Sequence, residues 1–187
     1  MKYLICMSLV LICLSGYTQN YKDFDVSNSS IPIAEIKDGG PPRNGIPSID
    51  SPEFLKADKA LLADQDRILG VEQNGIAKAY PLAILNFHEI VNDRFGDIPV
   101  VITYCPLCFS GIAFIAQANN KKLTFGVSGL LYNSNVLLYD RETESLWSQL
   151  KYQAISGPFK GQKLDALPTS NTTWGAWKEK HPQSLVL

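Results

Sequence analysis

The chain is organised around the stretch Ile98-Pro99-Val100-Val101-Ile102-Thr103-Tyr104-Cys105-Pro106-Leu107-Cys108, in which an apolar run ends in two cysteines. A short apolar run of this kind predicts a buried strand. The strand would deliver a Cys-x-x-Cys turn at its end, with both sulfurs on one side of the turn. Such a pair can close a structural disulfide, exchange electrons or hold a soft metal. The residues leave these three alternatives open.

The first 18 residues predict a secretory signal. Lys2 supplies the charged start, residues 4–14 supply an apolar core, and Ser15, Gly16 and Thr18 offer cleavage positions. This core is shorter than the roughly 20 residues that a membrane-spanning helix needs. We therefore expect a protein that is exported, to the periplasm or the extracellular space, and soluble after cleavage.

Removal of this signal would leave Cys105 and Cys108 as the only thiols, because Cys6 and Cys13 lie within it. Export implies an oxidising compartment, in which paired thiols can persist as a disulfide. Lipid attachment at Cys13 is the less expected alternative, because Ile12 precedes it where lipoprotein processing favours a small residue.

The charge balance excludes some classes of partner. The chain has 17 Lys and Arg against 18 Asp and Glu, a net charge of −1, and no basic run. This balance does not suggest nucleic acid or an anionic membrane surface as a partner, and no later segment predicts a membrane span. A small molecule or another protein is the partner class that stays open.

Segments rich in Pro and Gly divide the rest of the chain. Residues 19–50 are polar and rich in Pro, Gly, Ser and Asn, and predict an extended linker or arm. Residues 51–187 predict one domain. This domain would open with a helix from Ser51-Pro52-Glu53 to about Lys59, with Ser at the cap and Pro in the first turn.

Many short strands are expected in this domain. Asn74-Gly75 between two apolar runs predicts a hairpin. Pro81 would open a helix of three turns that includes Asn92 and ends at Gly96. Further strands are predicted at residues 111–116, 122–128, 136–141, 145–149 and 153–156, with a last helix at 172–180 capped by Asn171 or Thr172. The pattern favours an α+β domain of mostly antiparallel strands, with a small barrel as one arrangement.

Several longer motifs are similar to those of a known bacterial family. They are Asp38-Gly39-Gly40-Pro41-Pro42, Ala79-Tyr80-Pro81-Leu82, Asn86-Phe87-His88-Glu89-Ile90-Val91-Asn92-Asp93, Thr103-Tyr104-Cys105-Pro106-Leu107-Cys108, Phe125-Gly126-Val127-Ser128-Gly129-Leu130-Leu131-Tyr132-Asn133-Ser134, and Ser145-Leu146-Trp147-Ser148-Gln149. On these motifs the chain resembles DUF3179, a family of unknown function. The resemblance implies no activity, so the chemistry has to be argued from the residues.

A metal site is the leading interpretation. His88 lies on the helix that leads into the cysteine strand, and an imidazole with the thiolates of Cys105 and Cys108 would suit Zn²⁺ or Cu⁺. Glu89, Asp93 or water would complete the set. An exposed histidine on a helix face is the alternative for His88.

Two other functions stay open. In a thiol–disulfide oxidoreductase, Cys105 would attack and Cys108 would resolve, because Cys105 comes first after the strand and is expected to be the more exposed. The thioredoxin fold is disfavoured, because β-type residues 112–115 follow the pair where that fold has a helix. The remaining alternative is a structural or interaction domain that is stabilised by a short disulfide. Its functional residues would then lie elsewhere, around Asp140, Arg141 and Trp147.

Overall fold

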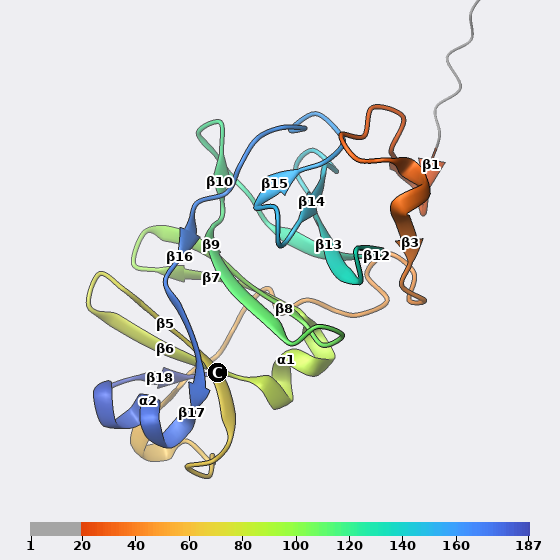
Figure 1. Ribbon diagram of the computed structural model, residues 1–187. Coiled ribbons are helices and arrows are strands. Elements are labelled where there is room, and N and C mark those ends of the chain that lie inside the picture. Colours follow the sequence, from red (N-terminus) through yellow and green to blue (C-terminus); the bar gives the residue numbers. More distant parts are fainter. Residues whose placement is uncertain (1–19) are drawn as a thin grey trace, which may run out of the picture.

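The computed structural model describes residues 20–187, so the predicted signal, Cys6 and Cys13 lie outside the described part of the chain. The described residues form three larger antiparallel or mostly antiparallel sheets, two small two-stranded ribbons and two short α-helices (Figure 1). The prediction of a mostly antiparallel α+β domain is confirmed. The sheets of residues 20–187 stay separate, so no closed barrel forms.

The central sheet carries the Cys-x-x-Cys stretch. Its strand order is β16-β9-β8-β7, and every neighbouring pair is antiparallel. The strands are β7 (Ile90–Phe95), β8 (Ile98–Cys105), β9 (Ser110–Ile115) and β16 (Ala166–Leu167). The predicted buried strand is therefore confirmed as β8, which has a partner along each edge.

Alternation along β8 sends neighbouring side chains to opposite sheets, because successive residues of a strand face opposite ways. Val101 and Cys105 pack into one apolar cluster with residues of β12 and β13, whereas Val100, Ile102 and Tyr104 pack into another with residues of β5 and β6. The central sheet thus lies between the two other large sheets, as Figure 1 shows.

The sheet on the Cys105 side, here the β12–β13 sheet, has the order β15-β14-β13-β12-β3. Its strands are β3 (Ile36–Asp38), β12 (Phe125–Tyr132), β13 (Asn135–Asp140), β14 (Leu146–Ser148) and β15 (Gln153–Ala154). Asn133 and Ser134, with φ of 50° and 58°, form a two-residue turn between β12 and β13. This left-handed turn places Asn135 at the start of β13, over the cysteines.

The sheet on the Tyr104 side, here the β5–β6 sheet, has the order β17-β5-β6-β18-β4, with β6 and β18 parallel. Its strands are β4 (Leu55–Lys56), β5 (Arg67–Gln73), β6 (Ile76–Pro81), β17 (Thr169–Thr173) and β18 (Leu185–Val186). Asn74 and Gly75, with φ of 53° and 75°, confirm the predicted hairpin between β5 and β6.

One helix prediction was wrong, and a second was wrong in its extent. The expected helix at residues 51–59 is β4 followed by a 3₁₀ turn, Ala57–Lys59, because β4 pairs with β18 at the sheet edge. Helix α1 (Leu82–His88) has two turns rather than three, because Glu89 turns left-handed at φ 56° and the next residues pair with β8 as β7. Gly96 accordingly lies in the β7–β8 turn.

Helix α2 (Trp174–Lys180) confirms the predicted C-terminal helix, and Trp174 and Trp177 are both buried. Its cap differs from the prediction. Thr173 Oγ1 accepts a hydrogen bond from the Ala176 N–H, so Thr173 takes the place expected for Asn171 or Thr172.

The segment predicted as a linker or arm packs against the β12–β13 sheet. Besides β3, it contains β1 (Asn20–Tyr21), β2 (Phe24–Asp25) and a 3₁₀ turn, Ile33–Glu35. Phe24, Val26, Ile31 and Ile36 are buried in one apolar cluster. The described part of this segment therefore supplies core residues, in spite of its polar composition.

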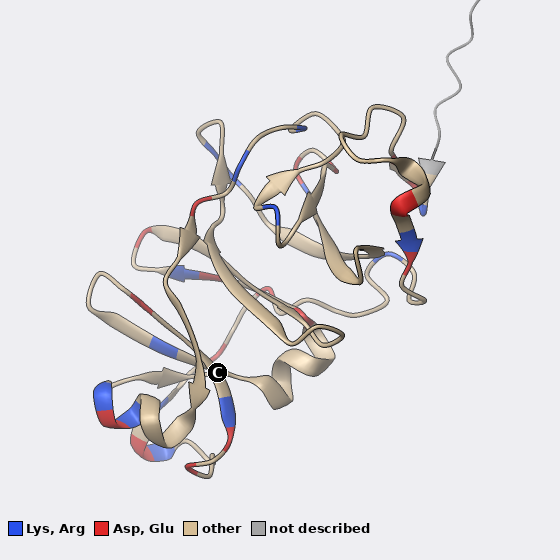
Figure 2. Cartoon of the chain, viewed as in Figure 1, with Lys and Arg blue, Asp and Glu red and all other residues tan. Residues whose placement is uncertain are grey.

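The remaining elements lie at the periphery. Strands β10 (Gln117–Ala118) and β11 (Lys121–Lys122) form a small ribbon, and its turn at Asn119-Asn120 was predicted. Among the described residues, no helix is long and apolar enough to cross a membrane. Acidic and basic residues are scattered over the cartoon of the chain, with Lys and Glu side by side on α2 (Figure 2).

Candidate functional site

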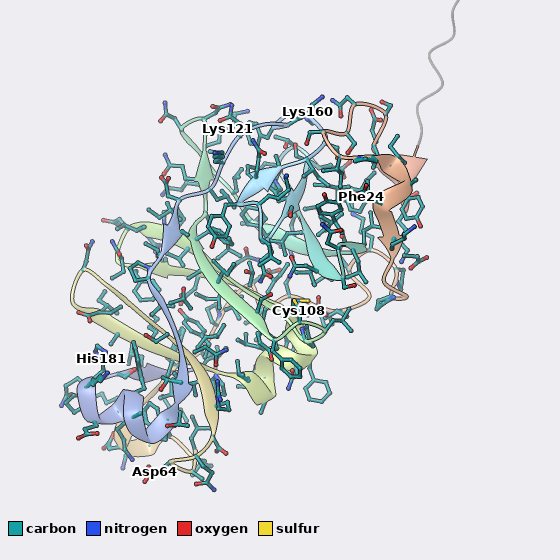
Figure 3. The ribbon with its side chains drawn as sticks, viewed as in Figure 1. Phe24, Asp64, Cys108, Lys121, Lys160 and His181 are labelled. Carbon is teal, nitrogen blue, oxygen red and sulfur yellow. The ribbon has the colours of Figure 1, made fainter. Side chains whose placement is uncertain are left out.

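The cysteine pair spans a hairpin turn rather than the start of a helix. Cys105 is the last residue of β8 and pairs with Ser110, the first residue of β9, and residues 106–109 close the turn. Phe109 has a left-handed backbone, with φ of 53°. Figure 3 shows Cys108 at this turn, beside α1. The pair therefore acquires its electrostatic environment from the neighbouring sheet rather than from a helix terminus.

The two thiols differ in exposure. Cys105 has no exposed surface and packs with Ile90 and Val101, whereas Cys108 is exposed, and both are free thiols. The expectation that Cys105 is the more exposed cysteine was wrong, because the alternation of β8 turns its side chain toward the β12–β13 sheet. Of the two thiols in residues 20–187, Cys108 is therefore the one open to attack on an external molecule.

Polar side chains surround the Cys108 sulfur. Asn135 Nδ2 donates to it at 3.2 Å, and the Ser110 hydroxyl lies 3.1 Å from it. Asn135 comes from β13 and Ser110 from β9, so the site joins two sheets. Sequence reasoning did not identify either residue as part of the site.

Gln149 anchors both of these residues. Its Oε1 accepts from Ser110 Oγ at 2.6 Å and from Asn135 Nδ2 at 2.7 Å, and its Nε2 donates to Thr103 Oγ1 at 2.9 Å. Thr103, Asn135 and Gln149 are all at most 2% exposed. A polar side chain inside the apolar β8 run, Thr103, was the available signal for a buried network. Its partners could not be located from the sequence.

Asn135 Oδ1 is buried without a hydrogen-bond partner among the described residues. Leaving such an atom unpaired costs about 1–3 kcal/mol. The amide is thus held with its N–H groups toward Cys108, Ser110 and Gln149 at the expense of its own acceptor. The orientation keeps a donor on the exposed sulfur.

These contacts separate the acidities of the two thiols. Partial burial raises the pKa of Cys108, but hydrogen bonds with Ser110, Asn135 and the Cys105 thiol outweigh it, and the pKa lies below its usual value. Burial raises the pKa of Cys105, and its hydrogen bond to Cys108 raises it further. Deprotonation therefore favours Cys108, and the thiolate is the reactive form of cysteine.

His88 does not complete a metal site in this structure. Its Nδ1 lies 2.8 Å from the Pro47 carbonyl oxygen. The Asp93 carboxylate already accepts hydrogen bonds from Lys78 Nζ at 2.8 Å and from the Tyr80 hydroxyl at 2.5 Å. Within residues 20–187, no three or more His, Cys, Asp or Glu side chains gather as a metal site would require. Binding of Zn²⁺ or Cu⁺ by Cys105, Cys108 and His88 thus stays a prediction.

Glu89 is the second unusual ionisable group near the turn. It is 9% exposed and lines a cavity of about 250 Å³ together with Pro106 and Leu107. Burial raises its pKa to about 7, and no residue in the described part of the chain pairs with its carboxylate. Sequence reasoning had it only as a fourth metal ligand.

The residues around Asp140 form a separate structural unit. The Asp140 carboxylate is fully buried and accepts hydrogen bonds from the Thr143 N–H and from Trp147 Nε1, which closes the β13–β14 turn. Arg141 instead pairs with Asp50 at 2.8 Å. These contacts join the turn and the segment before β4, away from the cysteine pair.

Comparisons with known proteins identify a family but no activity. The family model described as "Protein of unknown function (DUF3179)" matches residues 43–187. No curated protein and no solved structure matches the chain.

Proposed function

The chain belongs to the DUF3179 family, whose description names no activity, and we propose that its Cys105–Cys108 pair carries out thiol–disulfide exchange. The observation that carries the proposal is the asymmetry of the pair. Cys108 is exposed and accepts a hydrogen bond from Asn135, and its pKa lies below the usual value. Cys105 is buried, and its pKa lies above the usual value. A nucleophile and a resolving thiol need this difference.

The reaction begins at Cys108. Its thiolate attacks one sulfur of a substrate disulfide, the substrate S–S bond breaks, and one half leaves as a thiolate while the other half forms a mixed disulfide with Cys108. Cys105 then attacks Cys108 Sγ, and its proton passes to the second departing sulfur. The products are two substrate thiols and a Cys105–Cys108 disulfide, so two electrons pass from the protein to the substrate. An external dithiol restores the reduced pair.

The roles proposed here reverse those expected from the sequence. Order along the chain suggested Cys105 as the attacking thiol, but its side chain lies under the β12–β13 sheet, near the carbonyl of Ser134. A buried thiol meets no external disulfide, yet it lies beside Cys108 as a hydrogen-bond partner. Cys105 therefore suits the resolving step.

The predicted export signal, residues 1–18, supports a reaction in an oxidising compartment, where disulfide substrates are available. Binding of a soft metal by the same two sulfurs is the competing function. A zinc site would need two further ligands besides the two sulfurs, because structural zinc sites have four.

Trapping experiments on single-cysteine variants test the proposal. Cys105→Ser should accumulate a stable mixed disulfide at Cys108 with hydroxyethyl disulfide, visible by mass spectrometry, because nothing resolves it. Cys108→Ser should form no adduct in the native state, and the unsubstituted protein should end as an internal disulfide. Tight retention of zinc or copper, without any adduct at Cys108, would replace the proposal by the metal-binding function.

A further inference from the structure

A cavity of about 610 Å³ opens on the face of β8 opposite Cys105. Tyr104 and Phe109, which flank the cysteine pair in the sequence, both line it. Its apolar wall consists of Leu62, Pro81, Leu82, Ala83 and Phe109, and its polar residues are Asp66, Arg67, Asn86, Tyr104 and Asn171. The volume is in the range that takes a small organic molecule.

Among residues 20–187, Arg67 is the one basic side chain that lines this cavity. The chain has four arginines, and Arg43, Arg94 and Arg141 each form an ion pair with a carboxylate. Arg67 forms none with any residue in 20–187, and its Nη2 instead donates to the amide oxygen of Asn171 at 2.6 Å. The remaining guanidinium N–H groups are left for another acceptor, and a guanidinium binds a carboxylate with two parallel hydrogen bonds.

Tyr104 connects this charge to the thiols. Burial raises the pKa of its phenol, the neighbouring Cys105 and Cys108 raise it, and Arg67 lowers it, so all three groups lie within electrostatic range of one hydroxyl. The phenol is therefore neutral at pH 7 and is a donor. No described residue forms a hydrogen bond with it.

Asp66 is the single acidic side chain that lines the cavity. Its Oδ2 accepts a hydrogen bond from the Ala63 N–H at 2.8 Å, which holds the carboxylate in the turn before β5. A ligand with a positive group would meet Arg67 with repulsion. A ligand with an anionic end and an apolar chain matches the rest of the lining.

We propose that this cavity, the Arg67 pocket, binds the carboxylate of a small organic disulfide beside the turn that carries Cys108, whose exposed thiol then attacks the adjoining sulfur. The inference rests on the proposed thiol–disulfide exchange and names its substrate class. Arg67 and the Tyr104 hydroxyl hold the carboxylate, and Leu82 and Phe109 contact the carbon chain. The exchange steps are those given above, and the bound half leaves as a thiol that carries the carboxylate.

Three disulfides that differ in charge test the pocket: dithiodipropionate (anionic), hydroxyethyl disulfide (neutral) and cystamine (cationic). The protein should react with them in this order of rate. In Arg67→Leu the ratio of the anionic to the neutral rate should fall about fivefold, the effect of about 1 kcal/mol for a solvent-accessible ion pair. Arg67→Lys should recover part of the ratio, and Arg94→Leu, which removes a paired arginine elsewhere, should leave it unchanged.

Binding is tested separately from exchange with suberate, in which methylenes replace the two sulfurs of dithiodipropionate. Calorimetry should detect suberate binding to the unsubstituted protein and about fivefold weaker binding to Arg67→Leu, with equal thermal midpoints as evidence that both are folded. Suberate binding without exchange of any disulfide would reject the thiol function and keep the pocket. Disulfide exchange that shows no preference for the anionic substrate would reject the pocket and keep the thiol function. A faster reaction with a disulfide-bonded protein, at a rate that Arg67→Leu does not change, would lead to the same conclusion.

Discussion

Asn135 Nδ2 lies 3.2 Å from Cys108 Sγ, so a donor from β13 reaches a sulfur in the β8–β9 turn. The contact joins two sheets at the one exposed thiol of the described chain. The Asn135 amide is therefore expected to lower the pKa of Cys108, because a hydrogen bond to a thiolate stabilises the charged form.

Asn135→Ala should raise the pKa of Cys108 by about one unit, the equivalent of a hydrogen bond of about 1.4 kcal/mol to a charged group. The rate of Cys108 alkylation by iodoacetamide, measured against pH, reports this pKa. Asn28→Ala, an exposed Asn→Ala change near Gly157, is the matched control. An unchanged alkylation profile in Asn135→Ala would show that the contact does not tune the thiol.

The two cysteines should also label at very different rates in the native protein. Because Cys108 is exposed and Cys105 is not, brief alkylation at neutral pH should label Cys108, and Cys105 should be labelled only after unfolding in guanidinium chloride. Peptide mass mapping locates the label. Equal native labelling of both residues would contradict the proposed division of roles.

The raised pKa of Glu89 should make the free energy of unfolding depend on pH. Its pKa rises from 4.5 to about 7 on folding, so the folded state holds a proton that the unfolded state loses. The contribution of this group is full below pH 4.5 and is lost as the pH rises through 7, a change of about 3 kcal/mol.

Urea unfolding of Glu89→Gln between pH 4.5 and 8 should show that this part of the pH dependence has disappeared, and the variant should be the more stable protein at pH 8. Glu35→Gln, in the 3₁₀ turn before β3, serves as the control. A slope that persists in Glu89→Gln would assign the dependence to other groups.

The burial of Phe24 indicates that the N-terminal segment contributes to the stability of the fold. Its ring packs against Tyr139, with centroids 5.1 Å apart, and Arg43 lies over it at 4.8 Å. Phe24→Ala should lower the free energy of unfolding by about 3 kcal/mol, as expected for a fully buried phenylalanine. Denaturant unfolding measures the change, and Tyr21→Ala, at a partly buried position, should cost less. Equal small effects would mean that this segment is a detachable arm.

Local signals in the sequence predicted the parts of the fold that depend on local interactions. The Asn74-Gly75 turn and the β8 run were recognised because turn chemistry and hydrophobicity act over a few residues. The predicted helix over residues 81–92 failed at Glu89, because pairing of β7 with β8 overrides helical spacing. Long-range pairing of this kind leaves little trace in a single sequence.

The candidate site divides in the same way. The spacing of Cys105 and Cys108 identified the reactive pair, but Asn135 and Gln149 join it only through the packing of two sheets. The orientation of Asn135 depends on a two-residue turn at Asn133-Ser134, in the gap between the strands predicted at residues 122–128 and 136–141. Exposure of the two thiols was assigned the wrong way round because chain order was used in place of strand alternation.

That alternation also limits how this protein can change in length. Tyr104 and Cys105 are neighbours in sequence, yet one faces the β5–β6 sheet and the other the β12–β13 sheet. Insertion or deletion of one residue within β8 would exchange these two faces and remove both the thiol pair and the phenol from their surroundings. Length variation among functional relatives is therefore expected in the peripheral β10–β11 ribbon, and a constant length from Ile98 to Cys105.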